Sequence, residues 1–362
     1  NSLGDNKDII VDTDAPTASI AYTDELVKEN DIVNITVTFD AAMANTPQIA
    51  IDYAGTSELD TTNMSQVSTT VWAYNNITIP DGNDGAATVS IIGTDIAENA
   101  LTNPNSSFRS LMRVDNTHPT FTLLSPENGN YVNSRNVGYK LSETSFSGTA
   151  TWTRVGGEAD ANSPHAETLA ASELDAATTF DDHTLTNDPT TLVSGTNYSI
   201  TWSATDSAGN VSSDYIETPV FYETTAPTAA LTYSRYFASE DSVVTITATF
   251  NERALPTPQI AIDYNGDIGV GDDIAATNMT IGADSTIWTY AATIPAGDLN
   301  NGIAAVSLTA TDLATNSLQA VDVTATDTLV VDNTVPTVTF SYANVTQPTV
   351  VNKGKAGDIV NV

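Results

Sequence analysis

The sequence predicts an all-β protein made of tandem β-sandwich domains with Greek-key topology, about seven strands each, arranged end to end. Three observations lead to this fold class. Apolar residues alternate with polar ones at a period of two almost throughout the chain. Clusters of Gly, Asn, Asp and Pro cut this pattern into short segments. A proline-containing motif returns about every hundred residues, which is the length of one sandwich.

The returning motif is Val-Asp-Asn-Thr-His-Pro at residues 114–119, which recurs as Val-Asp-Asn-Thr-Val-Pro at 331–336. Altered copies stand at 11–16 and 222–227, and the four prolines are 103, 108 and 109 residues apart. Proline fixes φ and favours an extended residue before it, so each copy predicts a stiff joint between domains. The expected parts are a last strand of a preceding domain (1–11), three complete domains (12–115, 116–224 and 225–333) and the first strands of a further domain (334–362).

Individual strands are predicted where β-branched residues alternate or run together. Clear examples are residues 35–39, 49–53 and 89–92, each bounded by turn-forming residues. Residues 166–179 are the one candidate for a helix. Trp72 and Trp288 fall at equivalent strand positions and, with Trp152 and Trp202, are expected in the cores rather than on the surface as sugar platforms.

Comparison of the three complete domains with one another shows which of them are most similar in sequence. The segment Thr-Pro-Gln-Ile-Ala-Ile-Asp-Tyr at residues 46–53 returns unchanged at 257–264. The first and third domains are therefore close repeats that differ in their loops. The second domain, 116–224, is divergent, although it keeps Ser-Ala-Thr-Asp-Ser-Ala-Gly-Asn at 203–210.

Composition limits the function classes. The 362 residues include 45 acidic and 11 basic ones, for a net charge of -34, and no cysteine. Disulfides and thiol chemistry are excluded, and a chain this acidic repels nucleic acid and anionic lipid. No apolar run is long enough for a membrane helix. There is no initiator Met or signal-like start, so we expect an interior piece of a longer protein.

The motifs resemble a known family. Repeats of about this length that open after Val-Asp-x-Thr-x-Pro and carry Thr-Asp-x-Ala-Gly-Asn, as at 205–210, are similar to the bacterial immunoglobulin-like domains of giant surface adhesins, including the RTX type. The first and third domains lack the glycine of that turn, and Glu223 stands where the family has Asp. The resemblance implies an extracellular extender on the bacterial surface, with calcium at the joints, that holds a distal binding module away from the cell.

The residues support a calcium hypothesis on their own. In a seven-strand sandwich the last inter-strand turn lies at the pole where the chain enters, so Asp206 should approach residues 115–116, Asp95 residues 12–14, and Asp312 Glu223. Acidic turns of the preceding domain should meet them from its far pole. Calcium binds about six to eight oxygens, which such loops can supply; the alternative is that Asp and Asn cap turns there. The predicted ligands are Asp12, Asp14, Asp81, Asp84, Asp95, Asp115, Asn116, Asp206, Asn210, Glu223, Asp298, Asp312, Asp332 and Asn333.

A second acidic segment, residues 263–273, begins like an EF-hand loop. It has Ile268 and Ile274 where that loop needs Gly and Glu, so an acidic hairpin loop is the better interpretation. The three histidines, His118, His165 and His183, lie in no catalytic motif. We therefore predict that the chain is not an enzyme.

The main functional hypothesis is a calcium-stiffened extender whose partners are neighbouring repeats of the same polypeptide. One alternative is a subunit of an extracellular filament or surface layer, in which the end strands pair with identical chains by strand addition. A second alternative is a glycan-binding or ice-binding module, which would need a regular threonine array or an exposed aromatic row. Neither nucleic acid nor membrane insertion is expected.

Overall fold

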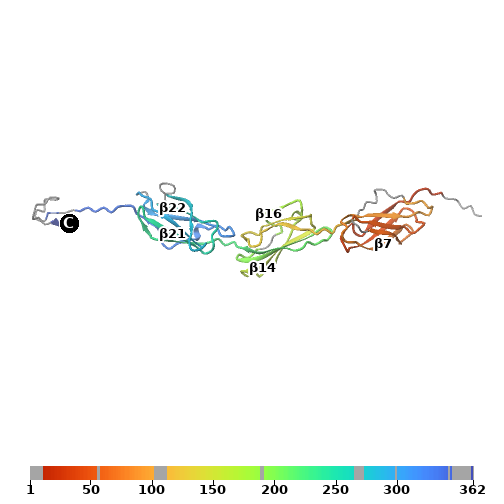
Figure 1. Cartoon of the computed structure of the whole chain (residues 1–362), viewed down its shortest axis with the longest axis horizontal. Helices are drawn as coiled ribbons and strands as arrows, with labels where there is room; N and C mark the ends of the chain where they lie inside the picture. Colours follow the sequence, from red (N-terminus) through yellow and green to blue (C-terminus); the bar gives the residue numbers. More distant parts are fainter. Residues whose placement is uncertain are drawn as a thin grey trace, which may run out of the picture. The chain divides into compact units, whose positions relative to one another are not determined.

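The computed structural model describes residues 11–54, 58–101, 112–187, 191–264, 273–297 and 300–340, and the backbone of 343–344 and 360–361. The described residues form three immunoglobulin-like β-sandwiches, each around its own hydrophobic core. In Figure 1 they are coloured red to orange, yellow to green, and teal to blue. The first two sandwiches belong to one compact unit, Asn1–Glu223, and the third to another, Thr224–Val362.

The first sandwich packs two sheets face to face. Apolar and polar residues alternate in β3 (Ile32–Phe39), so that one face of the strand is buried. The side chains that point into the core are Val33, Ile35, Val37 and Phe39. The sheets are β1 (Ala18–Tyr22), β3, β7 (Val71–Thr78) and β6 (Ser65–Gln66) against β5 (Glu58–Asn63), β4 (Gln48–Asp52) and β9 (Thr88–Ile92). A small third sheet joins β2 (Leu26–Val27), β10 (Arg113–Val114) and β8 (Gly85–Ala86) at the pole where the chain leaves.

The third sandwich repeats this plan, as the sequence repeat predicts. Its larger sheet is β24 (Thr280–Ile281), β25 (Ile287–Thr293), β21 (Val243–Phe250), β19 (Ala229–Tyr233) and β28 (Val323–Ala325). Facing it are β23 (Ile274–Asn278), β22 (Gln259–Asp263) and β27 (Ala305–Thr309), and the small sheet is β20 (Phe237–Ala238), β29 (Val330–Val331) and β26 (Gly302–Ile303). β22 pairs with β27 as β4 pairs with β9.

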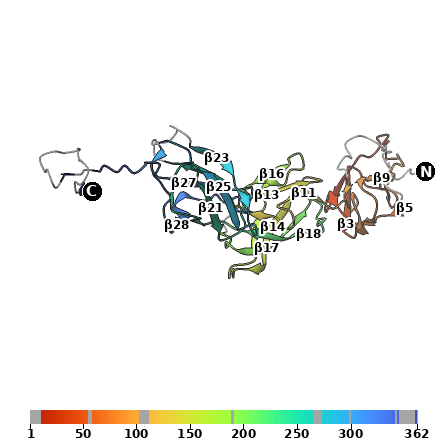
Figure 2. The ribbon, with the colours of Figure 1, turned by 60° about the vertical axis from the view of Figure 1, so that its left-hand side comes forward.

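The second sandwich has a different strand distribution (Figure 2). Its smaller sheet is β11 (Phe121–Ser125), β13 (Val137–Leu141) and β16 (Phe180–His183). Its larger sheet is β12 (Tyr131–Val132), β18 (Tyr215–Tyr222), β17 (Thr196–Thr205), β14 (Ser147–Gly157) and β15 (His165–Thr168). Trp152 and Trp202 are fully buried, and Trp72 and Trp288 are nearly so in the other two cores. The prediction that the four tryptophans are core residues is confirmed.

The helix considered for residues 166–179 is wrong. This stretch contains the end of β15 and a single 3-10 turn, η1 (Ala171–Glu173). His165 and Glu167 point inward while their neighbours are exposed, so the burial has the period of a strand. Another 3-10 turn, η3 (Ala320–Asp322), precedes β28. In the part of the chain that the structure describes, no helix is long and apolar enough to cross a membrane.

The predicted end strands fall mostly outside the described residues. Residues 1–10 lie outside them, as does most of 341–362. In that last segment two short strands, β30 (Ala343–Asn344) and β31 (Val360–Asn361), pair antiparallel with each other. The pairing of either end with another chain stays a prediction.

Candidate metal centre between the first two sandwiches

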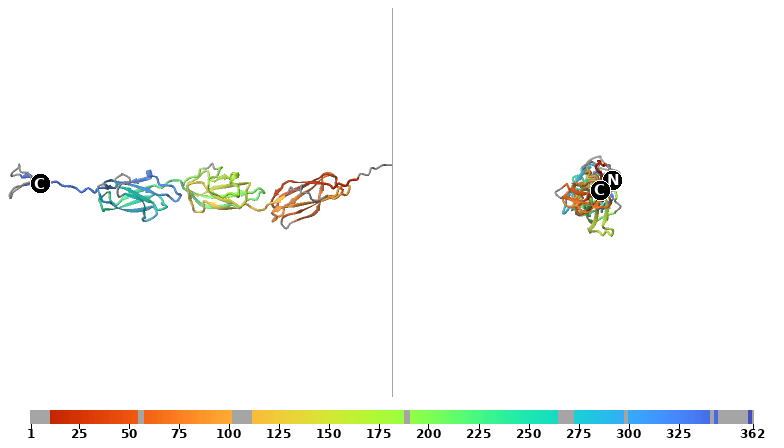
Figure 3. Two further views of the ribbon diagram at one scale, coloured as in Figure 1. Left: turned by 90° about the horizontal axis from the view of Figure 1, so that it is seen from above. Right: turned by 90° about the vertical axis from the view of Figure 1, so that its right-hand side faces the viewer.

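Residues 115–120, here called the 115–120 joint, connect the first sandwich to the second (Figure 3). Hydrogen bonds hold the joint to the first sandwich: the Asn116 N–H and the Thr117 hydroxyl donate to the two oxygens of Asp84, at 2.7 and 2.8 Å. Glu29 N–H donates to Asn116 Oδ1 at 2.6 Å. On the other side, Asn210 Nδ2 donates to the Asp115 carbonyl at 2.7 Å. Both sandwiches therefore bind the same short segment.

Asn210 is held by a loop that all three sandwiches share. Asp206, which is 3% exposed, accepts the Asn210 backbone N–H on Oδ1 and its Nδ2 on Oδ2, both at 2.8 Å. The turn between them needs a left-handed residue, and Gly209 supplies it with φ 88°. At the same point the first and third sandwiches have Glu98 (φ 67°) and Thr315 (φ 69°), so the turn forms without glycine.

The loop keeps its contacts in the other sandwiches. Asp95 accepts hydrogen bonds from Asn99, which lower the pKa of that carboxyl despite its burial. Asp312 accepts the same two bonds from Asn316, at 2.8 and 2.7 Å. These carboxylates therefore stabilise their own turns, as the alternative interpretation of the acidic loops expects. A carboxylate with two such bonds still has lone pairs for a metal ion.

A third carboxylate, Glu143, reaches the 115–120 joint from the bend that follows β13. Asp115, Glu143 and Asp206 each direct an oxygen into a group in which all three atoms lie within 4.8 Å of one another. Glu143 Oε1 is buried and has no hydrogen-bond partner among the described residues. Burial raises the pKa of Glu143, and the charges of Asp115 and Asp206 raise it further. These three residues fit a hard cation, because oxygens are calcium's ligands and a divalent charge would remove their repulsion.

A hydrogen bond that recurs in all three sandwiches sets the position of Glu143. In each sandwich, the side chain of the residue just after β3, β13 or β21 accepts the backbone N–H of the residue just before β1, β11 or β19. Thr17 N–H donates to Asp40, Thr120 N–H donates to Ser142, and Thr228 N–H donates to Asn251. The next residue is Ala41 in the first sandwich, Glu143 in the second and Glu252 in the third. The first sandwich therefore has no carboxylate at this position, whereas the second and third sandwiches each have one.

The structure places the remaining predicted ligands in several ways. Asp12 belongs to the entry of the first sandwich, where its carbonyl accepts Asn99 Nδ2 at 3.2 Å and its carboxylate accepts Asp14 N–H at 3.1 Å. Asp81 is exposed and offers its carbonyl to Asn83 Nδ2 at 2.7 Å. Within the residues described, three clustered carboxylates occur at Asp115, Glu143 and Asp206 alone.

At the exit of the third sandwich, Asn333 acts as a donor. Its Nδ2 bonds the carbonyls of Pro295 and Gly297 at 3.1 and 3.0 Å, and Asp332 accepts Thr334 N–H at 3.0 Å. Asp298 lies outside the described residues, as does most of the acidic segment 263–273. Glu223 accepts the Ser194 hydroxyl at 2.7 Å. Its predicted approach to Asp312 would join the two compact units and stays a prediction.

Glu143 was missed by sequence reasoning, as were the partners of two histidines. His165 Nε2 lies 2.5 Å from Asp160, which also accepts the Tyr198 hydroxyl at 2.6 Å. His183 Nε2 lies 2.9 Å from Glu173. Asp160, His165 and Glu173 are each 9% exposed or less, so these pairs satisfy polar groups inside the second sandwich.

Comparison with known proteins gives a fold-level result. No protein-family model matches the chain, and no curated protein does. Among solved structures it is similar to a tetra-tandem repeat in the extending region of a large adhesion protein, at 17% identity over 83% of this chain and 72% of that one, with a TM-score of 0.27. It is also similar to chicken CNTN1 FN1-FN3 domains (13% identity, 84% and 96% covered, TM-score 0.30) and to the mouse nectin-like molecule 4 ectodomain (13%, 87% and 99%, 0.23). Similarity at this level concerns the β-sandwich fold.

Proposed function

We propose that this chain is a spacer segment of an extracellular bacterial adhesin, in which calcium at inter-domain joints stiffens a tandem of immunoglobulin-like sandwiches and projects a distal binding module. The observation that carries the proposal is the group of Asp115, Glu143 and Asp206 at a joint already bonded to both sandwiches. A cation there would link the connecting segment to the pole of the second sandwich.

The hydrogen bonds of the joint support a mechanical role. Asp84 holds the joint to the first sandwich, and Asn210 holds it to the second. Such bonds resist bending only while both sides stay in contact, and unscreened carboxylates push the contact apart. A bound divalent ion would reverse that repulsion, so the joint would be stiff when calcium is present and compliant when it is removed.

The experiment is a distance measurement across the 115–120 joint. Since the chain has no cysteine, spin labels can be attached at introduced cysteines without removing native ones. Thr61→Cys in the first sandwich and Thr153→Cys in the second are both exposed positions. Double electron–electron resonance should give a narrow distance distribution in calcium and a broad one after chelation.

Small-angle scattering of the full chain in the same two buffers reports on all joints at once. A distance distribution that is equally narrow with and without chelator would contradict the calcium mechanism while leaving a spacer role intact. Broad distributions in both buffers would contradict the stiff spacer itself.

A further inference from the structure

The first strand of the second sandwich is β11, and one of its edges has no partner strand among the described residues. In the third sandwich, the corresponding edge of β19 is paired. In the third sandwich, β28 runs parallel to β19 and pairs with it from Ala229↔Val323 to Leu231↔Ala325. In the second sandwich, the corresponding residues form the first part of β18, which pairs with β17, while the last part of β18 pairs with β12 as β29 pairs with β20. Among the described residues, β11 therefore pairs on one side alone, with β13. In the described part of the chain, the second sandwich thus lacks the strand that pairs with β19 in the third sandwich.

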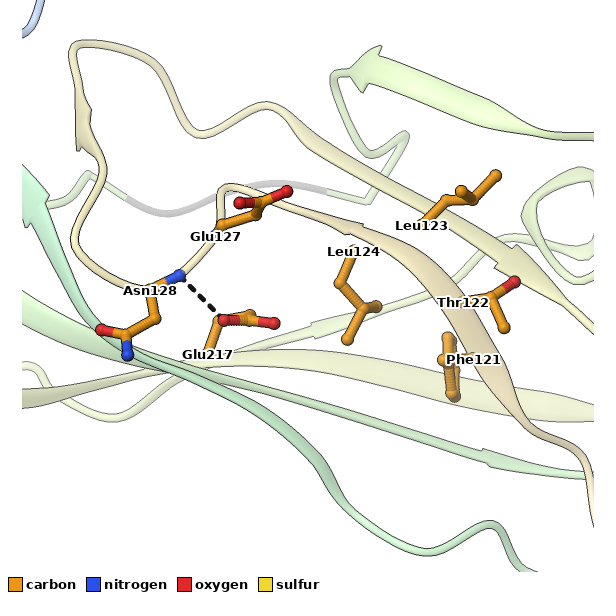
Figure 4. Close-up of a pocket in the computed structure, with 7 residues that line it drawn as sticks. All are labelled: Phe121, Thr122, Leu123, Leu124, Glu127, Asn128 and Glu217. Carbon is orange, nitrogen blue, oxygen red and sulfur yellow. Dashed lines mark hydrogen bonds between the residues drawn. The ribbon is translucent and has the colours of Figure 1, made fainter.

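A hollow of about 440 Å³ lies along this open edge, between β11 and β18 (Figure 4). Its β11 side is Phe121, Thr122, Leu123 and Leu124. Leu123 is 66% exposed at the rim, while Phe121 is buried. Leu123 and Leu124 thus give one side of the hollow apolar contact beside an unpaired backbone, which is the combination that strand-addition sites use.

The backbone direction of β11 follows from its pairing. Ser142 N–H donates to the Thr120 carbonyl, and Thr122 lies opposite Lys140. In an antiparallel pair, alternate residues direct their N–H and C=O groups away from the partner strand, so those of Phe121 face the open edge. Leu123, with φ 56°, then turns the backbone and ends the regular edge. Main-chain pairing is therefore short, and side chains must supply selectivity.

The far end of the hollow is acidic. Glu217 is half-buried on β18, and its Oε2 accepts Asn128 N–H at 2.8 Å, while Glu127 is exposed beside it (Figure 4). Among the described residues, neither carboxylate has an ion pair with a basic side chain. Residues 128–130 also cover the edge of β18, since Gly129 N–H bonds Pro219 O and Phe221 N–H bonds Asn130 O. An added strand therefore cannot pair with this part of β18, whereas the edge of β11 stays accessible to it.

We propose that this edge binds an extended segment of a partner protein, which pairs with β11 and places an apolar side chain in the hollow and a lysine or arginine between Glu127 and Glu217. The unpaired Phe121 backbone, the apolar wall and the acidic end each select one feature of that segment. This interaction does not depend on calcium at the 115–120 joint.

The test is a nuclear magnetic resonance titration of the full chain with two peptides, acetyl-Thr-Val-Thr-Lys-Thr-amide, whose Val and Lys lie on the same face of a strand, and the same peptide with Glu in place of Lys. The lysine peptide should shift amide signals of residues 121–124, 127, 128 and 217, and the glutamate peptide should not. Glu217→Gln should weaken binding about three- to fivefold, as expected for one partly exposed charge pair. Leu123→Lys should weaken it as well, because a positive charge would replace the apolar side chain at the rim that the lysine peptide contacts.

Glu58→Gln is the matched control, since Glu58 is exposed on β5 of the first sandwich and the change in net charge is the same. Thermal unfolding verifies that each variant is folded. Equal binding of both peptides, equal weakening by Glu217→Gln and Glu58→Gln, or no shift at millimolar lysine peptide would each overturn the proposal.

Discussion

Replacing Glu143 by Gln should uncouple the second sandwich from calcium. The substitution keeps the size of the side chain and removes one of three charges. The oxygens of Asp115, Glu143 and Asp206 lie within 4.8 Å of one another. At an effective dielectric constant of about 20, two unit charges at that distance repel by about 3.5 kcal/mol. Glu143 takes part in two of the three repulsive pairs, so the charge loss affects both metal-free stability and metal affinity.

The size of the calcium effect follows from mass action. Extracellular modules bind calcium with Kd on the order of 0.1 to 1 mM. If Kd is about 0.1 mM, about 10 mM calcium stabilises the folded state by about 2.7 kcal/mol. One carboxylate fewer should weaken binding on the order of 10- to 100-fold, which reduces that gain to about 1.4 or 0.4 kcal/mol. For a domain of this size, 1 kcal/mol corresponds to about 4 to 8 °C in Tm.

The assay is calorimetric unfolding of the full chain in calcium and in chelator, with Asp181→Asn as the control. Asp181 is exposed on β16 and belongs to the same sandwich, so its variant has the same net charge without altering the joint. Glu143→Gln should lose about half or more of the calcium-induced rise in Tm, and the control should keep it. If both variants keep the full rise, Glu143 is not a ligand. If neither the parent chain nor the control gains Tm in calcium, the joint does not bind the ion.

Three further outcomes follow from the same structure. The hydrogen bonds that Asp160 accepts from Tyr198, His165 and Asn162 outweigh its burial and hold its pKa at about 2. Its stabilising effect should therefore be complete above pH 4 and be lost as the pH falls towards 2; urea unfolding across this range should show a flatter acid decline for Asp160→Asn. Asn210→Ala removes donors to Asp206 and to the joint, and should cost about 2 kcal/mol in chemical denaturation as well as broaden the spin-label distances. Trp152→Ala empties a fully buried site and should cost about 3 to 5 kcal/mol, measured by the same denaturation.

Strand content was predictable because it is a local property. Residues 35–39, 49–53 and 89–92 read as strands and fall within or next to β3, β4 and β9. Alternate side chains of a strand point to opposite faces, so the buried positions appear in the sequence as apolar residues at every second position. The same rule explains the error at residues 166–179, where the alternation at His165 and Glu167 is only a few residues long and alanines follow it.

The joint illustrates the opposite case. Asp115 and Asp206 could be expected to meet, because both lie next to the pole at which the chain enters the second sandwich. Glu143 follows Asp115 by 28 residues and precedes Asp206 by 63, and nothing in its immediate neighbours marks it. Glu143 reaches Asp115 and Asp206 because the hydrogen bond from Thr120 N–H to the Ser142 hydroxyl fixes the end of β13 at that pole.

The sequence by itself determined an acidic, cysteine-free series of β-sandwiches, in which the first and third are close repeats and the second diverges. The tertiary structure decided which acidic side chains converge, that Asp206 and Asn210 bond each other, and that β11, among the residues described, has an unpaired edge where β19 is paired. The physical reason is distance along the chain. Alternation and turn formation involve neighbouring residues, whereas the order of strands in a sheet brings together loops that are far apart in the sequence.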